Sequence, residues 1–341
     1  MASQASQVID DLKNGTYAPV YFLQGDEPFY IDQITDFIED NAIEESQKGF
    51  NQVVMYGKDH EMNAVILQAK RFPMMSERQV VIVKEAQEIK DISRESGGKL
   101  LSEYVKNPLP STILVFAHKN KTIDGRSALS KALKKYAVFV DSKKLYENQV
   151  PNWISEFVST KGHKIHPKAQ QLLVESAGSD LSKLSNEINK ILINFTEKIE
   201  ITADHVSKYV GVSKDYNVFE LQNALAKRNV LKANKIIAYF AKDPKGNPLI
   251  PIIALLYGYF VKVVLIHQCK DKSERGVADL LKVNPFFVKD YLAAAKNFNL
   301  SQSLNIVKFL FEADLRSKGV NSGSMNEEQI LKELVFKILH V

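Results

Sequence analysis

Cysteine is almost absent from this chain, which has only Cys269 in 341 residues. A single cysteine excludes an internal disulfide and indicates a reducing compartment. We therefore expect a cytoplasmic protein in which Cys269 is a small buried residue. The opening residues, MASQASQVIDDLKNG, also lack the basic start and apolar core of an export signal.

A long apolar run without interruptions is missing as well. The nearest approach is residues 249–266, LIPIIALLYGYFVKVVLI, which Pro251, Gly258 and Lys262 interrupt. We predict a helix that is buried on most sides, either in a helical domain or against neighbouring subunits, and no contact with a membrane.

Charge of one sign does not dominate, because 45 Lys and Arg face 40 Asp and Glu, for a net charge of +5 and a pI near 8.9. This mild excess permits contact with nucleic acid without requiring it. Hydrophobic residues make up 45% and charged residues 25% of the chain, which is typical of globular proteins. The length favours two or three domains.

The first 142 residues alternate between apolar runs and amphipathic segments. The runs predict strands at 20–23, 53–56, 79–83, 112–116 and 137–140. The segments between them predict helices at 30–44, 62–71, 99–106 and 125–135. This alternation is typical of an α/β domain with a parallel sheet and helices on both faces.

Helical periodicity takes over after residue 142. Three helices are predicted at 150–161, 167–177 and 181–195, with Gly178, Ser179 and Asp180 capping between the last two and Thr202 starting a fourth. Seven more are predicted at 218–227, 230–240, 248–269, 276–281, 285–296, 301–318 and 327–339. The apolar surface of these last helices predicts oligomer contacts.

The sequence predicts a strand followed by a turn at Gly25 and a helix that begins at Pro28. This arrangement is the one in which nucleotide-binding α/β proteins bind a phosphate. The P-loop pattern is missing there, and Asp26 and Glu27 put carboxylates at the helix N-terminus, where they repel a polyphosphate. Taken alone, the pattern favours an ordinary βα turn with a good N-cap. The strand at 79–83 runs into Lys84, which cannot ligate magnesium as an Asp would. We therefore expect no nucleotide cofactor.

No other pattern predicts catalysis. His163 and His166 form H-x-x-H without a further ligand at metal spacing, so a surface or capping role is expected and no metal site. Cys269 lies in an apolar helix with only His267 nearby, and no nucleophile motif is present. We expect no catalytic residues.

Residues 72–79, FPMMSERQ, break the local rules because Pro73 ends a helix and leaves Met74 and Met75 in a connection. Adjacent exposed methionines suit insertion into a partner's apolar pocket. Alternatively, one or both lie under the sheet edge as ordinary core. The pattern alone favours neither.

Three segments in this order resemble the delta-subunit family of the bacterial DNA polymerase III clamp loader. They are the turn at 25–28, the F-P-M-M-S-E-R segment at 72–78 and the G-S-D-L-x-x-L-x-x-E pattern at 178–187. The resemblance covers nearly the whole chain. It implies an AAA+-like fold, with a RecA-like sheet domain at 1–142, a helical lid at 143–212 and a helical collar at 213–341.

The resemblance also implies a function. A member of this family binds the ring-shaped beta sliding clamp and helps to open it for loading onto primed DNA, without intrinsic ATPase activity. It is part of the DNA polymerase III holoenzyme, a DNA-directed DNA polymerase complex, and joins tau/gamma and delta prime subunits in a heteropentamer. The family's clamp-binding pair maps onto Met74 and Met75, with Phe72 and Pro73 as supports. Other members often carry Leu and Phe, so Met-Met is a departure.

Two other functions remain open at this point. One is an active AAA+ ATPase or helicase-like motor with an unusual phosphate loop, and the other is a stand-alone DNA-binding regulator with salt-dependent affinity. Lys119, Lys121 and Arg126 are possible phosphate contacts, but we favour a solvated basic loop and predict no site there.

Overall fold

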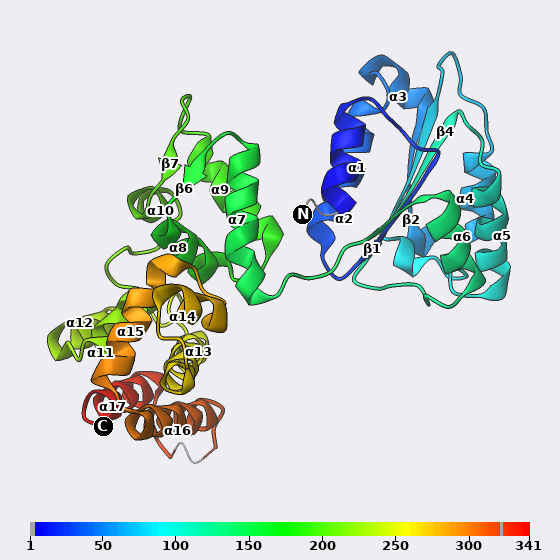
Figure 1. The fold of residues 1–341 in the computed structure, drawn as a ribbon. Coiled ribbons are helices and arrows are strands. Elements are labelled where there is room, and N and C mark those ends of the chain that lie inside the picture. The colour runs from blue at the N-terminus through cyan, green and yellow to red at the C-terminus, as the bar shows by residue number, and fades with distance from the viewer. Residues whose placement is uncertain (1–3, 321–322) are drawn as a thin grey trace. The chain divides into compact units, whose positions relative to one another are not determined.

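The computed structural model describes residues 4–320 and 323–341, and the chain divides into two compact units, Met1–Leu145 and Tyr146–Val341 (Figure 1). The first contains the sheet, and the second is almost entirely helical.

The first unit is built on a five-stranded sheet in the order β2-β3-β4-β1-β5, and every pairing in it is parallel. The strands are β1 (Val20–Gly25), β2 (Gln52–Tyr56), β3 (Gln79–Lys84), β4 (Thr112–Lys119) and β5 (Val138–Asp141). All five predicted strands and the parallel sheet are thus confirmed.

Helices cover both faces of this sheet, as predicted (Figure 1). They are α1 (Gln4–Lys13), α2 (Pro28–Asn41), α3 (Glu45–Asn51), α4 (Met62–Ala69), α5 (Glu95–Lys106) and α6 (Ala128–Tyr136), with short 3₁₀ turns at Gly57–Asp59 and Ala86–Glu88. α1 and α2 cover one face, and α4, α5 and α6 cover the other. Helices α1 and α3 were not predicted.

Alternate residues of β1 point to opposite faces of the sheet and join different cores. Val20 and Phe22 join the core beneath α4, α5 and α6, whereas Tyr21 and Leu23 join the core beneath α1 and α2. The ring centroid of Phe22 lies 5.6 Å from that of Phe116 on β4. A strand buried on both faces needs a continuous apolar run, which is why the sequence pattern identified it.

The second unit consists of helices and one very small sheet. The helices are α7 (Val150–Thr160), α8 (Pro167–Ala177), α9 (Leu181–Leu192), α10 (Ala203–Tyr209), α11 (Val218–Ala226), α12 (Val230–Lys242), α13 (Leu249–Gln268), α14 (Glu274–Leu281), α15 (Val288–Asn297), α16 (Leu300–Ser317) and α17 (Glu327–Leu339), with 3₁₀ turns at Glu147–Gln149 and Pro285–Phe287. The parallel strands β6 (Lys164–Ile165) and β7 (Glu200–Ile201) were not predicted. The division of this region into lid and collar at residue 212 stays a prediction.

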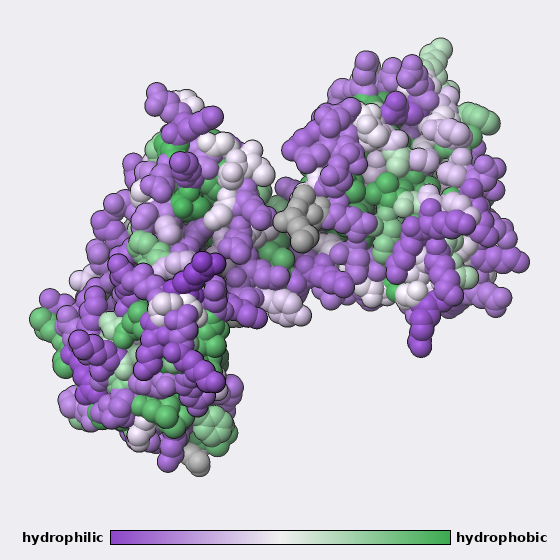
Figure 2. Space-filling model, in the orientation of Figure 1, coloured by the Kyte–Doolittle hydropathy of each residue, from purple (hydrophilic) through white to green (hydrophobic). Residues whose placement is uncertain are grey.

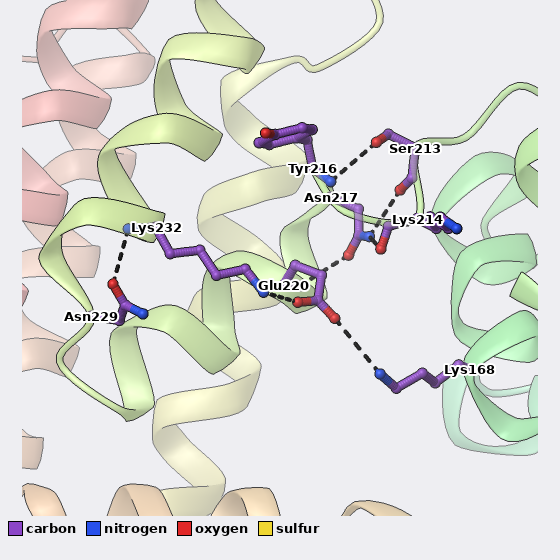
Figure 3. A network of polar contacts seen from close by, with 8 residues as sticks. All are labelled: Lys168, Ser213, Lys214, Tyr216, Asn217, Glu220, Asn229 and Lys232. Carbon is purple, nitrogen blue, oxygen red and sulfur yellow. Dashed lines mark hydrogen bonds and ion pairs between the residues drawn. The ribbon is translucent and has the colours of Figure 1, made fainter.

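A polar network ties α8 to α11 and α12 inside this unit (Figure 3). Glu220 on α11 accepts a hydrogen bond from the ammonium of Lys232 on α12, and its other oxygen lies 3.9 Å from Nζ of Lys168 on α8. Asn217 caps α11 by accepting from the Glu220 N–H at 2.9 Å. The α8–α11 contact has a second link, because the Val218 N–H donates to Oε1 of Glu175 at 2.9 Å.

α13 is the one helix among the described residues that is long and apolar enough to cross a membrane, by length and composition only. Leu256, Phe260 and neighbours on one face pack into the core of the unit. Ile250, Tyr257 and Leu265 remain exposed on another face, and 44% of the apolar window is buried. The helix is therefore less buried within the chain than predicted, and its burial against neighbouring subunits stays a prediction.

Candidate protein-docking site

The candidate site lies in the segment between α4 and β3. Helix α4 ends at Ala69, two residues before the end predicted from the sequence. Side chains from the sheet and α5 bond the carbonyl oxygens at this end. The Thr112 hydroxyl donates to the Ala69 carbonyl at 2.9 Å and the Tyr104 hydroxyl at 3.3 Å, while the Gln79 amide donates to the Arg71 carbonyl. The helix end is therefore fixed before Pro73 is reached, and the base of the segment is rigid.

The four predicted site residues lie at the tip of this segment. Phe72 is 76%, Met74 63% and Met75 101% exposed, and Pro73 is half-buried. Burial of the methionines under the sheet edge, the alternative left open by the sequence, does not occur. Figure 2 shows apolar atoms projecting from this end of the first unit, beside a mostly hydrophilic surface.

A buried amide holds the backbone of the tip in place. Asn51, the last residue of α3, is only 2% exposed, and its side chain makes two hydrogen bonds to Met74. The Met74 N–H donates to Oδ1 at 2.7 Å, and Nδ2 donates to the Met74 carbonyl at 2.9 Å. The Ser76 hydroxyl also donates to Oε1 of Gln47 at 2.8 Å. The loop and α3 therefore form one hydrogen-bonded platform.

Met75 has a left-handed backbone, with φ of 52°. This conformation costs a non-glycine residue about 1 kcal/mol or more. The bonds from Asn51 to the preceding residue help to maintain it. A fully exposed apolar side chain on a left-handed backbone makes Met75 a candidate for contact with another molecule.

The Gly25 turn follows β1 at the opposite, carboxyl-terminal edge of the sheet. Gly25 has φ of 132°, and a Cβ there would lie 2.0 Å from the carbonyl oxygen of Ser142. The Glu27 N–H donates to that same oxygen at 3.1 Å, so the chain after β5 covers the turn. The Glu27 carboxylate accepts from the Phe29 N–H at 3.1 Å and caps α2, as its position in the sequence predicted. Two backbone donors of this turn, the N–H groups of Glu27 and Phe29, are thus engaged within the chain and not free for a phosphate.

The end of β3 carries an ion pair in place of magnesium ligands. Nζ of Lys84 lies 2.7 Å from a carboxylate oxygen of Glu39. Burial opposes the charge of Lys84, but its hydrogen bond to Glu39 and the nearby Asp36 raise its pKa overall. Burial, followed by the charge of Asp32, raises the pKa of Asp36. An ammonium ion fixed in this way repels a divalent cation.

The other sequence candidates have structural roles. His166 caps α8, accepting from the Lys168 N–H at 3.3 Å, and His163 accepts from the Ile199 N–H at 3.1 Å. No group of three or more metal-ligating side chains occurs within residues 4–320 and 323–341. Cys269 is half-buried just after α13, where its Sγ donates to the Asp271 carbonyl at 3.0 Å, so the prediction of full burial is wrong.

The basic residues that were considered as phosphate contacts are each paired with a carboxylate. Lys119 pairs with Asp32, Nζ of Lys121 lies 2.9 Å from Glu88, and Nε of Arg126 lies 3.5 Å from Asp124. The interpretation as a solvated loop accounts for these contacts.

Two family models match this chain. The model described as DNA polymerase III, delta subunit, matches residues 21–143, and that of the DNA polymerase III delta subunit, C-terminal domain, matches residues 215–338. The chain belongs to the DNA polymerase III delta subunit family.

Relatives of this delta-family chain extend the match. The DNA polymerase III subunit delta of Bacillus subtilis is 29% identical over 337 residues, which are 96% of this chain and 95% of the relative. The probable subunit delta of Aquifex aeolicus is 22% identical over 262 residues, 75% of this chain and 72% of the relative. The solved structure of the Bacillus subtilis DNA clamp loader delta protein (YqeN) has 26% identity and a TM-score of 0.57, and the match covers 99% of this chain and 100% of that one. The predicted fold class, an AAA+-like α/β unit followed by helical domains, is confirmed.

Sequence reasoning about this delta-family chain found the methionines and missed the residues that hold them. Asn51 lies 23 residues before Met74, in a segment where no helix was predicted. The only available signal was an asparagine two residues before an apolar run, which is equally typical of an ordinary turn. Its hydrogen-bond partner, Met74, lies close to it only because β2 and β3 pair in the folded sheet.

Proposed function

We propose that this chain is a non-catalytic clamp-loader subunit in DNA replication. It binds the ring-shaped sliding clamp through Phe72, Pro73, Met74 and Met75, and helps to open the ring for loading onto primed DNA. One observation carries the proposal: two adjacent methionines are exposed at the tip of a loop whose backbone is fixed by Asn51. Membership of the delta-subunit family supports the same role.

The docking energy comes from burial of the tip. Inserting each methionine into an apolar pocket contributes about 1.5–3 kcal/mol. Because the loop is ordered before binding, little of this energy is lost to ordering its backbone. The loop promotes opening only if it binds the open ring better than the closed one. A shift from 1:99 to 99:1 requires about 5.5 kcal/mol of differential binding, so the two methionines supply part of it.

A second candidate function is an active AAA+ ATPase or helicase-like motor. The covered Gly25 turn and the Lys84–Glu39 ion pair favour the non-catalytic subunit over the motor. In the proposed complex, ATP is handled by partner subunits of the tau/gamma type, with delta prime completing a heteropentamer in the cytoplasm. The exposed apolar face of α13, in the predicted collar 213–341, is suited to contact with such partners.

The test is clamp binding by the intact chain. We expect the double substitution Met74→Ser with Met75→Ser to weaken binding to the purified sliding clamp by at least about 100-fold, which corresponds to about 2.8 kcal/mol. Surface plasmon resonance measures the dissociation constant. Ile193→Ser, which also removes an exposed apolar side chain but in the second unit, is the matched control. Full affinity in the double variant would remove these residues from the site.

A further inference from the structure

Side-chain hydrogen bonds join helix α3 to the methionine loop, residues 70–78 between α4 and β3. Asn51 and Gln47, both on α3, hydrogen-bond to Met74 and Ser76 of the loop. α3 leads into β2, and the loop leads into β3, which pairs with β2 in parallel. Both segments therefore lie at the amino-terminal edge of the sheet, as Figure 1 shows. A partner that docks on the loop meets α3 as part of the same surface.

The face of α3 toward solvent carries an exposed apolar side chain. Phe50 is 75% exposed, directly beside the buried Asn51. Among the phenylalanines of the described residues, Phe72 and Phe50 are the two most exposed, and both lie at this edge. A phenylalanine left exposed does not contribute the stabilisation of about 1.5–3 kcal/mol that its burial would give. Two exposed phenylalanines and two exposed methionines thus lie at the same edge of the sheet, and exposed apolar side chains grouped in this way mark protein-binding surfaces.

The distance between Phe50 and the loop is short compared with a protein interface. Phe50 is one residue, about 3.8 Å of backbone, from Asn51, whose side chain bonds directly to Met74. A stable interface buries about 800 Å² on each partner, a patch much wider than this separation. An interface of standard size centred on the methionines is therefore wide enough to include Phe50.

We propose that Phe50 is a second contact with the sliding clamp, so that the docking surface has two parts, the loop at 72–75 and the exposed end of α3. This inference rests on the proposed function and extends it. The occupant of Phe50 is an apolar patch on the clamp next to the pocket that receives the methionines. Two contacts on one rigid platform fix the orientation of the clamp, which a single loop tip does not.

The experiment compares Phe50→Ser and Phe50→Leu in the intact chain, with the sliding clamp as the probe. We expect Phe50→Ser to weaken binding about tenfold, and Phe50→Leu to restore most of the affinity because it keeps an apolar contact. Phe311→Ala, which removes another exposed phenylalanine from α16 in the second unit, should bind as the parent does. Circular dichroism melting should give the parent Tm for Phe50→Leu.

The outcomes separate this inference from the proposed function. Loss of affinity in both Phe50→Ser and the double methionine variant supports both. Parent affinity in Phe50→Ser with loss in the methionine variant overturns the second contact and leaves the proposed function standing. Parent affinity in both variants overturns both. Equal loss in Phe50→Ser and Phe50→Leu, with a lowered Tm in both, shows that Phe50 supports the fold and overturns the contact.

Discussion

Asn51 illustrates how a buried polar residue positions an exposed one. Its amide hydrogen-bonds both backbone groups of Met74, so the backbone of the tip is held while the Met74 and Met75 side chains stay exposed. Neither partner identifies the other in the sequence, because the link depends on the pairing of β2 with β3. Composition and local pattern located the tip, whereas the support required the folded sheet.

The left-handed backbone of Met75 allows a substitution that removes the apolar side chain and keeps the backbone conformation. Asparagine adopts this region more readily than methionine does, so Met75→Asn should preserve the loop and the Tm. Loss of the apolar insertion should weaken clamp binding about tenfold, measured by surface plasmon resonance. Lys282→Asn, at another exposed left-handed position with φ of 52°, is the control and should leave affinity unchanged. Parent affinity in Met75→Asn would show that Met75 does not enter the clamp.

At the scale of elements, the structure shows which patterns carry information. The strands buried on both faces were predicted within a few residues, because a continuous apolar run bounded by turns has few alternatives. Most helices of the second unit were also predicted, down to the cap at Asp180, which accepts from the Lys183 N–H at 3.0 Å. Helix α3 was missed because its sequence, ESQKGFN, buries only Asn51 and so lacks an apolar period.

The contact between α8 and α11 predicts a specific pH dependence. Burial raises the pKa of Glu175 from 4.5 to about 7, although the Val218 N–H opposes the shift, and no described residue hydrogen-bonds its Oε2. Between these pH values the folded chain holds the proton and the unfolded chain has released it, so stability falls as pH rises from about 4.5 to about 7. At about 1.36 kcal/mol per pKa unit, the loss approaches about 3 kcal/mol.

Glu175→Gln removes this titration and keeps an acceptor for the Val218 N–H. We expect the variant to be more stable than the parent at pH 8 and to converge with it near pH 4. Urea unfolding followed by circular dichroism across this range measures the difference. Glu197→Gln, at an exposed carboxylate, should follow the parent curve. A pH profile in Glu175→Gln identical to that of the parent would assign the dependence to other groups.

At the scale of the whole molecule, the chain combines an α/β unit that carries the methionine loop with a helical unit, and both match models of the delta family. The sequence predicted this succession because periodicity changes from strand to helix near residue 142. It could not predict how the Gly25 turn is closed. That closure depends on Ser142, which is 117 positions away and comes into contact only through the pairing of β1 with β5.

The closed turn predicts that nucleotide does not stabilise this protein. Magnesium-ATP at millimolar concentration should leave the Tm unchanged in differential scanning fluorimetry. A ligand at 100 times its dissociation constant adds about 2.7 kcal/mol of stability, which raises the Tm by several degrees in a unit of this size. An ATP-binding loader subunit in the same assay is the positive control. A rise of several degrees would favour the motor function.

The parallel sheet has a consequence for how such a protein changes over time. Strand beginnings lie along one rim of the sheet and strand endings along the other, so the methionine loop before β3 and the glycine turn after β1 occupy opposite rims. Substitutions accumulating on one rim leave the geometry of the other intact. A fold of this kind can therefore lose the catalytic residues of one rim and keep a binding surface on the other.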